Sequence, residues 1–159
     1  MLRCMKTSLY DLDFYAWSNK QAALLRAGKL SEADIENIAE EIESMGKTEK
    51  KELVSRLTVL LLHLLKWQHQ PMRRGKSWEV TIKTQRNNIA RHLVQNPSLK
   101  THVQEAVGWA YEDARLEASA ETELAESTFP QACPWTFDQV VDARFWPGQS
   151  DKRAKFASP

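Results

Sequence analysis

The sequence predicts an all-α fold, a single-domain bundle of four or five helices with an aromatic C-terminal segment packed on it. Apolar residues recur at helical spacing through most of the 159-residue chain. No stretch shows the strict alternation that is typical of half-buried strands. The run from Leu57 to Leu65 is apolar nearly all round, as expected for a helix surrounded by its neighbours. We expect one domain over residues 1–159, with a core from about residue 9 to 147 and flexible ends at 1–8 and 148–159.

A first helix is predicted from Tyr10 to Gly28. Asp11 or Asp13 can cap its N-terminus, where an acidic side chain also favours the helix dipole. Gly28 suits the left-handed residue just beyond the C-terminus.

A second helix is predicted from Ser31 to Met45, and it opens with a Ser-x-x-Asp sequence close to a capping box. It carries one apolar stripe, made of Ile35, Ile38, Ala39, Ile42 and Met45. Gly46 either ends this helix or lets the chain continue directly into the next one.

The central helix is predicted from Thr48 to His69, and Pro71 stops it because proline cannot continue the hydrogen-bond ladder. The short loop that follows predicts an antiparallel neighbour. Ser77 is the expected cap of that neighbour, whose buried face is formed by Trp78, Ile82, Ile89 and Leu93.

A fifth helix is predicted from Ser98 to about Glu123, with Asn96 as its cap and Pro97 at its first position. After it, Thr136-x-x-Gln139 can start a short helix. The aromatic segment around Phe145, Trp146 and Pro147 is expected to pack on the bundle.

Composition excludes several classes of protein. The formal net charge is +1, so the total gives no reason to expect nucleic acid, membrane or acidic substrates. Acids concentrate between residues 31 and 52 and bases between 66 and 91, which is also what helices that pair with each other would show. Two cysteines give neither a disulfide framework nor a zinc signature. The start has no secretory signal and no run is long enough for a membrane span, so we expect a cytoplasmic protein with no membrane contact.

The ordered motifs resemble those of one bacterial family. They read LYDLDFYAW, NIAEEIESMG, LLLHLLKWQHQP, SWEVTIKTQR, NPSL, ETEL and FPQACPWTFDQVVD, and they cover the chain from Leu9 to Trp146. The chain resembles the "domain of unknown function twenty-nine" family. The resemblance implies an all-α fold and supplies no activity, cofactor or catalytic residue.

A buried polar group is predicted around Glu41, Arg56 and His63. Arg56 and His63 lie seven residues apart on one helix face, and an arginine among leucines needs an acidic partner. A structural ion pair with a hydrogen-bonded histidine explains this pattern. The alternative is a hydrolytic or metal-assisted enzyme in which His63 is a general base and Glu41 orients it or holds a metal. No recognised catalytic, cofactor or metal-ligand motif accompanies them, so we predict no cofactor and no metal.

A basic aromatic turn is predicted over residues 67–86. Arginine forks bind phosphates and tryptophans stack on bases, so the turn has the residues of a nucleic-acid or phosphate site. Its members are Trp67, Gln70, Arg73, Arg74, Lys76, Trp78 and Arg86. The alternative is that the two tryptophans hold the helical hairpin together while the charges remain solvated.

A third hypothesis is a helical adaptor or homodimer that uses apolar surface not needed for its own core. The chain has more aromatic residues than the core requires, and such residues favour interfaces. They are Trp17, Trp109, Phe129, Trp135, Phe145 and Trp146. From the sequence we therefore predict a non-enzymatic binding or interaction protein, with the basic turn as its contact surface and a nucleic acid, phosphate or protein as its partner.

Overall fold

The computed structural model describes residues 7–149, which contain helices and no strand, so the all-α prediction is confirmed. The expected flexible ends fall mainly on residues 1–6 and 150–159, which lie outside the described part. The α-helices are α1 (Leu9–Leu12), α2 (Phe14–Arg26), α3 (Ile35–His69), α4 (Lys76–Gln95), α5 (Val103–Thr122) and α6 (Phe137–Val141). The 3-10 segments are η1 (Leu30–Glu32), η2 (Pro71–Arg73), η3 (Pro97–His102) and η4 (Glu126–Thr128).

The chain forms two compact units, and each is described by itself. The first unit comprises residues 1–48 and the second residues 49–159. Helix α3 supplies residues to both units, because it is continuous through Gly46. The sequence leaves open whether the helix ends at Gly46, and the structure shows that it does not.

The first unit begins with two helices where the sequence predicts one. Ser8 caps α1 through a capping box with Asp11, and Asp13 then caps α2 by accepting a hydrogen bond from Ala16 N at 2.9 Å. Asp13 therefore interrupts the expected helix and starts a new one. Gly28 follows α2 with φ of 70°, as the sequence predicts.

Helix α3 starts later than the sequence predicts, so the cap assigned to Ser31 is wrong. Residues 30–32 form η1 instead. The Asp34 carboxylate accepts hydrogen bonds from Asn37 N, Asn37 Nδ2 and Trp17 Nε1. Asp34 therefore lies at the start of α3 and also binds the Trp17 side chain of α2. The spacing of residues around Ser31 gives no sign of this contact.

The starts of α4 and α5 also differ from their predicted positions. Helix α4 begins one residue before Ser77, with Gly75 in an extended conformation at its cap. Pro97 opens η3 rather than an α-helix, and α5 begins only at Val103. By contrast, the predicted capping box of Thr136 and Gln139 is present at α6.

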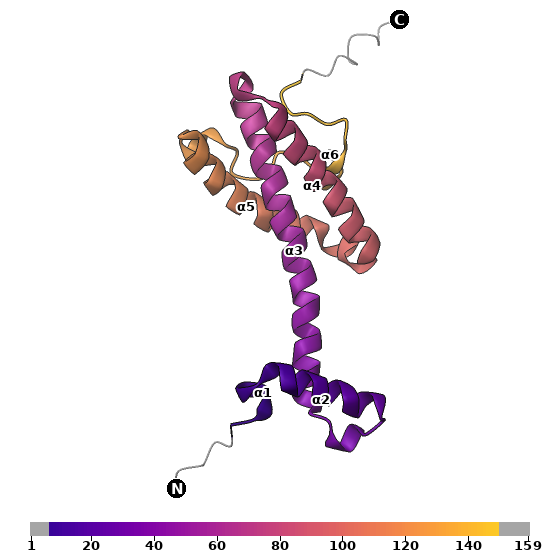
Figure 1. Ribbon diagram of the computed structural model, residues 1–159. Helices are drawn as coiled ribbons and strands as arrows, with labels where there is room; N and C mark the ends of the chain where they lie inside the picture. The colour runs from indigo at the N-terminus through magenta and orange to yellow at the C-terminus, as the bar shows by residue number, and fades with distance from the viewer. Residues whose placement is uncertain (1–6, 150–159) are drawn as a thin grey trace, which may run out of the picture. The chain divides into compact units, whose positions relative to one another are not determined.

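The core of the second unit surrounds the leucine-rich part of α3, and α4 and α5 lie on either side of it (Figure 1). Leu57, Leu61 and Leu64 are fully buried. Small residues on α5 let that helix approach closely: Ala106, Ala110, Ala114 and Ala118. Phe129 and Val140 complete the core from the C-terminal part of the chain. This arrangement brings residues 137–149 alongside α3 and α4, where the predicted basic turn lies.

Candidate functional site

Arg86 lies inside the second unit. It is 4% exposed, and the periodicity of α4 places it between Ile82 and Ile89 on the buried face. Its Nε donates a hydrogen bond to the carbonyl oxygen of Val140 at 2.9 Å, and its Nη2 donates to that of Phe145 at 2.7 Å. The guanidinium therefore ties the end of α6 and the segment after it to α4.

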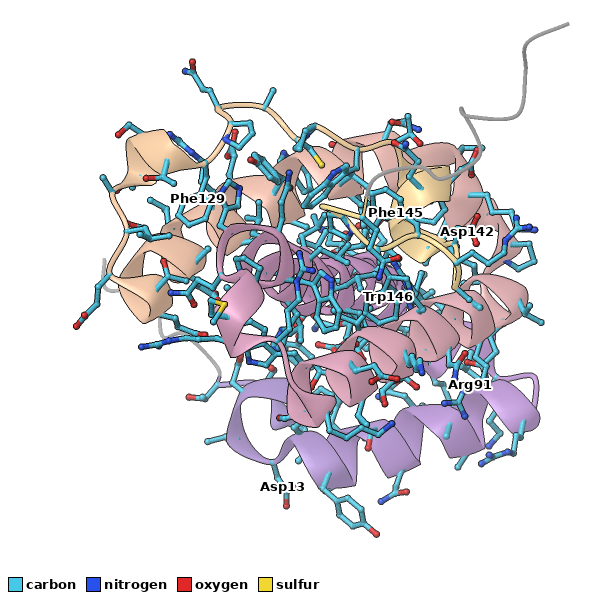
Figure 2. The ribbon with its side chains drawn as sticks, turned by 90° about the horizontal axis from the view of Figure 1, so that it is seen from above. Asp13, Arg91, Phe129, Asp142, Phe145 and Trp146 are labelled. Atoms are coloured by element: carbon cyan, nitrogen blue, oxygen red, sulfur yellow. The ribbon has the colours of Figure 1, made fainter. Side chains whose placement is uncertain are left out.

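The surroundings of Arg86 are apolar and aromatic. Its guanidinium carbon lies 5.3 Å from the centre of the Trp146 ring, and Figure 2 shows Asp142, Phe145 and Trp146 together beside α6. Burial lowers the pKa of Arg86 to about 10, an effect that the Asp142 carboxylate partly opposes. Two carbonyl oxygens and an aromatic face replace part of the water that the charge loses, and Nη1 is buried without a hydrogen-bond partner.

Arg74, which lies just before α4, contacts the same segment. Its Nε donates to the carbonyl oxygen of Trp67 at 2.8 Å, and its Nη2 lies 3.5 Å from that of Pro147. The ring centres of Trp67 and Trp146 are 4.7 Å apart. Trp67 is thus packed against the C-terminal segment.

Trp78 is also occupied by a contact within the unit. Lys66 Nζ lies 4.8 Å from the centre of the Trp78 ring and 2.6 Å from Glu121 Oε2. Trp78 therefore covers a lysine that joins α3 to α5, and only part of its ring faces solvent.

Few of the predicted binding side chains remain at the surface of the turn. Arg73 is exposed, and so is Lys76, whose Nζ lies 3.6 Å from Glu79. Gln70 is half-buried where α3 ends, and its carbonyl oxygen accepts from Arg73 N. Two basic members of the predicted site, Arg73 and Lys76, thus face solvent, and Met72 between α3 and α4 is the most exposed apolar residue of the turn.

Arg56 and His63 find separate local partners. Arg56 Nη2 lies 2.5 Å from Glu52 Oε1, one helical turn earlier. His63 Nδ1 lies 2.8 Å from the carbonyl oxygen of Val59, and burial lowers the pKa of His63. A histidine that donates from Nδ1 to its own helix is a structural arrangement, and it leaves Nε2 as the acceptor.

Glu41 belongs to the first unit and His63 to the second. Glu41 accepts a hydrogen bond from the Tyr10 hydroxyl, which raises the pKa of Tyr10 to about 12. The sequence places Glu41 on a separate, preceding helix, and that expectation is wrong because α3 is continuous. The contacts of each side chain are therefore explained within its own unit.

No group of three or more His, Cys, Asp or Glu side chains suited to a metal ion occurs among residues 7–149. In the same part of the chain, no helix is both long and apolar enough to cross a membrane.

The first unit presents a surface that the sequence interpretation treats only as packing. Among the described residues, nine of the fourteen large hydrophobic side chains that are exposed lie in this unit. They are Leu9, Leu12, Phe14, Tyr15, Leu25, Leu30, Ile35, Ile42 and Met45. The signal was present in the predicted stripe of residues 35–45, but amphipathic spacing does not show whether a chain covers its own stripe.

Comparison with known proteins identifies a family without an assigned activity. The model of the family "Domain of unknown function DUF29" matches residues 9–146. The chain belongs to this family. No curated protein and no solved structure matches the chain.

Proposed function

We propose that the protein is a non-enzymatic interaction protein and that the exposed apolar surface of its first unit is the contact surface. One observation carries the proposal. Trp17 is the only large hydrophobic side chain of the first unit that is buried, among residues 7–48. A unit of that size needs a larger buried apolar area than this to be stable by itself.

The exposed hydrophobic side chains of the first unit are too numerous to be isolated surface residues. Ile42 is 63% exposed, Met45 68% and Leu12 70%. Single exposed hydrophobic residues are ordinary, but many within one short unit mark a surface that another molecule covers. Burial of this surface would supply the apolar area that the unit lacks.

The polar side chains singled out as catalytic favour the same proposal. His63, Arg56 and Glu41 each have a polar partner within their own unit. Residues engaged in this way stabilise a fold.

We also propose that the protein works in the cytoplasm. Cys133 is a free thiol whose Sγ lies 3.4 Å from the carbonyl oxygen of Trp135, and burial raises its pKa. A thiol kept in this state suits a reducing compartment.

A photo-crosslinking amino acid in place of Ile42 tests the proposed contact in living cells. We expect irradiation to join Ile42 to a second protein molecule, which gel mobility and mass spectrometry would identify. The same amino acid in place of Glu117, an exposed position on α5, is the matched control and should form far less adduct.

Two results would contradict the proposal. One is the absence of any adduct at position 42. The other is an adduct that joins position 42 only to residues of the same chain, since the surface would then be covered without a partner.

A further inference from the structure

The outer face of α4 carries more basic than acidic side chains. Six exposed residues recur there at spacings of three or four: Lys76, Val80, Lys83, Asn87, Arg91 and Val94. Figure 2 shows Arg91 on the side of α4 away from α6. Glu79 lies at the flank and contacts both Lys76 and Lys83, so it offsets one of the three charges. The face therefore combines two apolar residues with a positive field.

The exposed face of α3 in the first unit has the opposite sign. Ile35, Ala39 and Ile42 recur along one side of the helix and all are exposed. Glu36 and Glu43 follow one edge of this apolar row, also exposed. Between residues 30 and 46 the chain has six acidic residues and no basic one. This face needs a partner that is apolar at its centre and basic at its edge.

We propose that the partner of the first unit is a second copy of this chain, whose outer α4 face receives the α3 face of residues 35–43. This inference rests on the proposed function. The charges match in spacing as well as in sign. Glu36 and Glu43 are seven residues apart, as are Lys76 and Lys83, and two helical turns span roughly 10.5 Å on each helix.

The contact joins two different surfaces of the same chain. Two copies can form this contact twice, because each copy has one acidic and one basic face. The result is a closed dimer with no unpaired face. Each chain would then give its first unit to its partner and receive the partner's first unit. The exchange buries exposed apolar residues of α3 in both copies and pairs Glu36 and Glu43 of each copy with Lys76 and Lys83 of the other.

Sedimentation velocity over a range of concentrations, with reciprocal charge reversals, tests the pairing. The wild-type chain should sediment at twice the mass of one chain. The Glu36→Lys/Glu43→Lys variant places basic side chains against the basic face of α4, and the Lys76→Glu/Lys83→Glu variant places acidic side chains against the acidic face of α3. The dimer of each variant alone should have a dissociation constant at least about tenfold higher than that of the wild type. An equimolar mixture of the two variants should recover the dimer, because every contact again joins opposite charges.

A Glu112→Lys/Glu117→Lys variant on exposed positions of α5 is the matched control and should dimerise like the wild type. Circular dichroism confirms that each variant is folded. If one reversal variant does not fold, a chain that carries both reversals is the second test, since it should dimerise with itself. A dimer that is insensitive to either reversal, or a mixture that does not recover it, overturns the proposed pairing.

The two proposals fail differently. A wild-type chain that sediments as a monomer, and whose photo-crosslinker at Ile42 joins a different protein, overturns the second-copy proposal and leaves the interaction function intact. A monomer without any intermolecular adduct at Ile42 overturns both.

Discussion

At the scale of single residues, charged side chains in the second unit bind the chain to itself. Arg86 and Arg74 both donate to backbone carbonyl oxygens of other segments, and each lies against a tryptophan ring. Bonds from a charged donor to carbonyl oxygens contribute more than neutral ones. These two arginines therefore hold residues 140–147 on the bundle through the backbone carbonyl oxygens of that segment and through the Trp146 ring.

Replacement of Arg86 by Met should destabilise the protein strongly. The methionine fills a similar space, but the carbonyl oxygens of Val140 and Phe145 lose their donor inside the unit. We expect the free energy of unfolding to fall by about 2–4 kcal/mol. Urea denaturation followed by tryptophan fluorescence measures this change, and Arg73→Met on the exposed turn should stay within about 0.5 kcal/mol of the wild type. Equal losses for the two variants would show that Arg86 does not hold the segment.

Stability should decrease as the pH falls through the titration range of histidine. Burial lowers the pKa of both His63 and His69 below the ordinary value of 6.5. The unfolded chain therefore binds more protons than the folded one as the pH drops below that value, and the free energy of unfolding falls. Urea denaturation between about pH 7.5 and 5.5 measures the slope. The His63→Gln/His69→Gln variant should show a flatter slope, whereas a variant of the exposed His102 should not. A slope unchanged in the double variant would argue against buried neutral histidines.

The structural role of Arg86 was within reach of the sequence. Arg86 lies four residues after Ile82 and three before Ile89, so the same periodicity that predicts the buried face of α4 includes it. Its basic neighbours in the sequence nevertheless favour its assignment to the basic turn. Its acceptors could not be predicted, because Val140 and Phe145 are more than 50 residues away in the chain and local patterns carry no information about them.

At the scale of elements, helix type and most helix ends follow local chemistry. Pro71, Gly28 and the Thr136 capping box act as their sequence context predicts. The starts that differ depend on contacts between elements. Asp34 caps α3 because Trp17 and Gln21 of α2 fix that position, whereas Ser31 satisfies the capping pattern in sequence alone. Local patterns thus predict that a helix exists better than they predict where it begins.

The start of α3 can be tested with two single substitutions. Asp34→Ala removes the acceptor of Asn37 N and of Trp17 Nε1, so the first turn of α3 should lose protection from amide hydrogen exchange. Ser31→Ala removes only the expected cap and should leave that protection unchanged. Hydrogen exchange detected by mass spectrometry on peptides covering residues 33–42 measures both. A larger loss of protection in Ser31→Ala than in Asp34→Ala would show that Ser31 is the cap, as the sequence predicts.

At the scale of the whole molecule, burial divides the chain unequally. The second unit has a continuous core of leucines, isoleucines and alanines, whereas the first unit buries Trp17 and Gln21. The sequence shows an apolar stripe in both, since Ile35 to Met45 and Leu53 to Leu65 are both patterned for burial. Only the structure shows that one stripe is covered by its own unit and the other is exposed.

This difference predicts that protection of the first unit depends on protein concentration. Local opening is easiest where few apolar contacts are buried, so amides of α2 should exchange quickly when the chain is dilute. As the protein concentration rises, a second copy covers the apolar face. Amide exchange in α2 should then slow in proportion to the ratio of dimer to monomer. Amides of Leu57 to Leu65 should exchange slowly at every concentration, because their surroundings lie within one unit. The Glu36→Lys/Glu43→Lys variant should keep α2 in fast exchange throughout. Slow exchange of α2 in dilute wild-type protein would show that the first unit is stable without a partner, which would remove the physical basis of the proposed interaction.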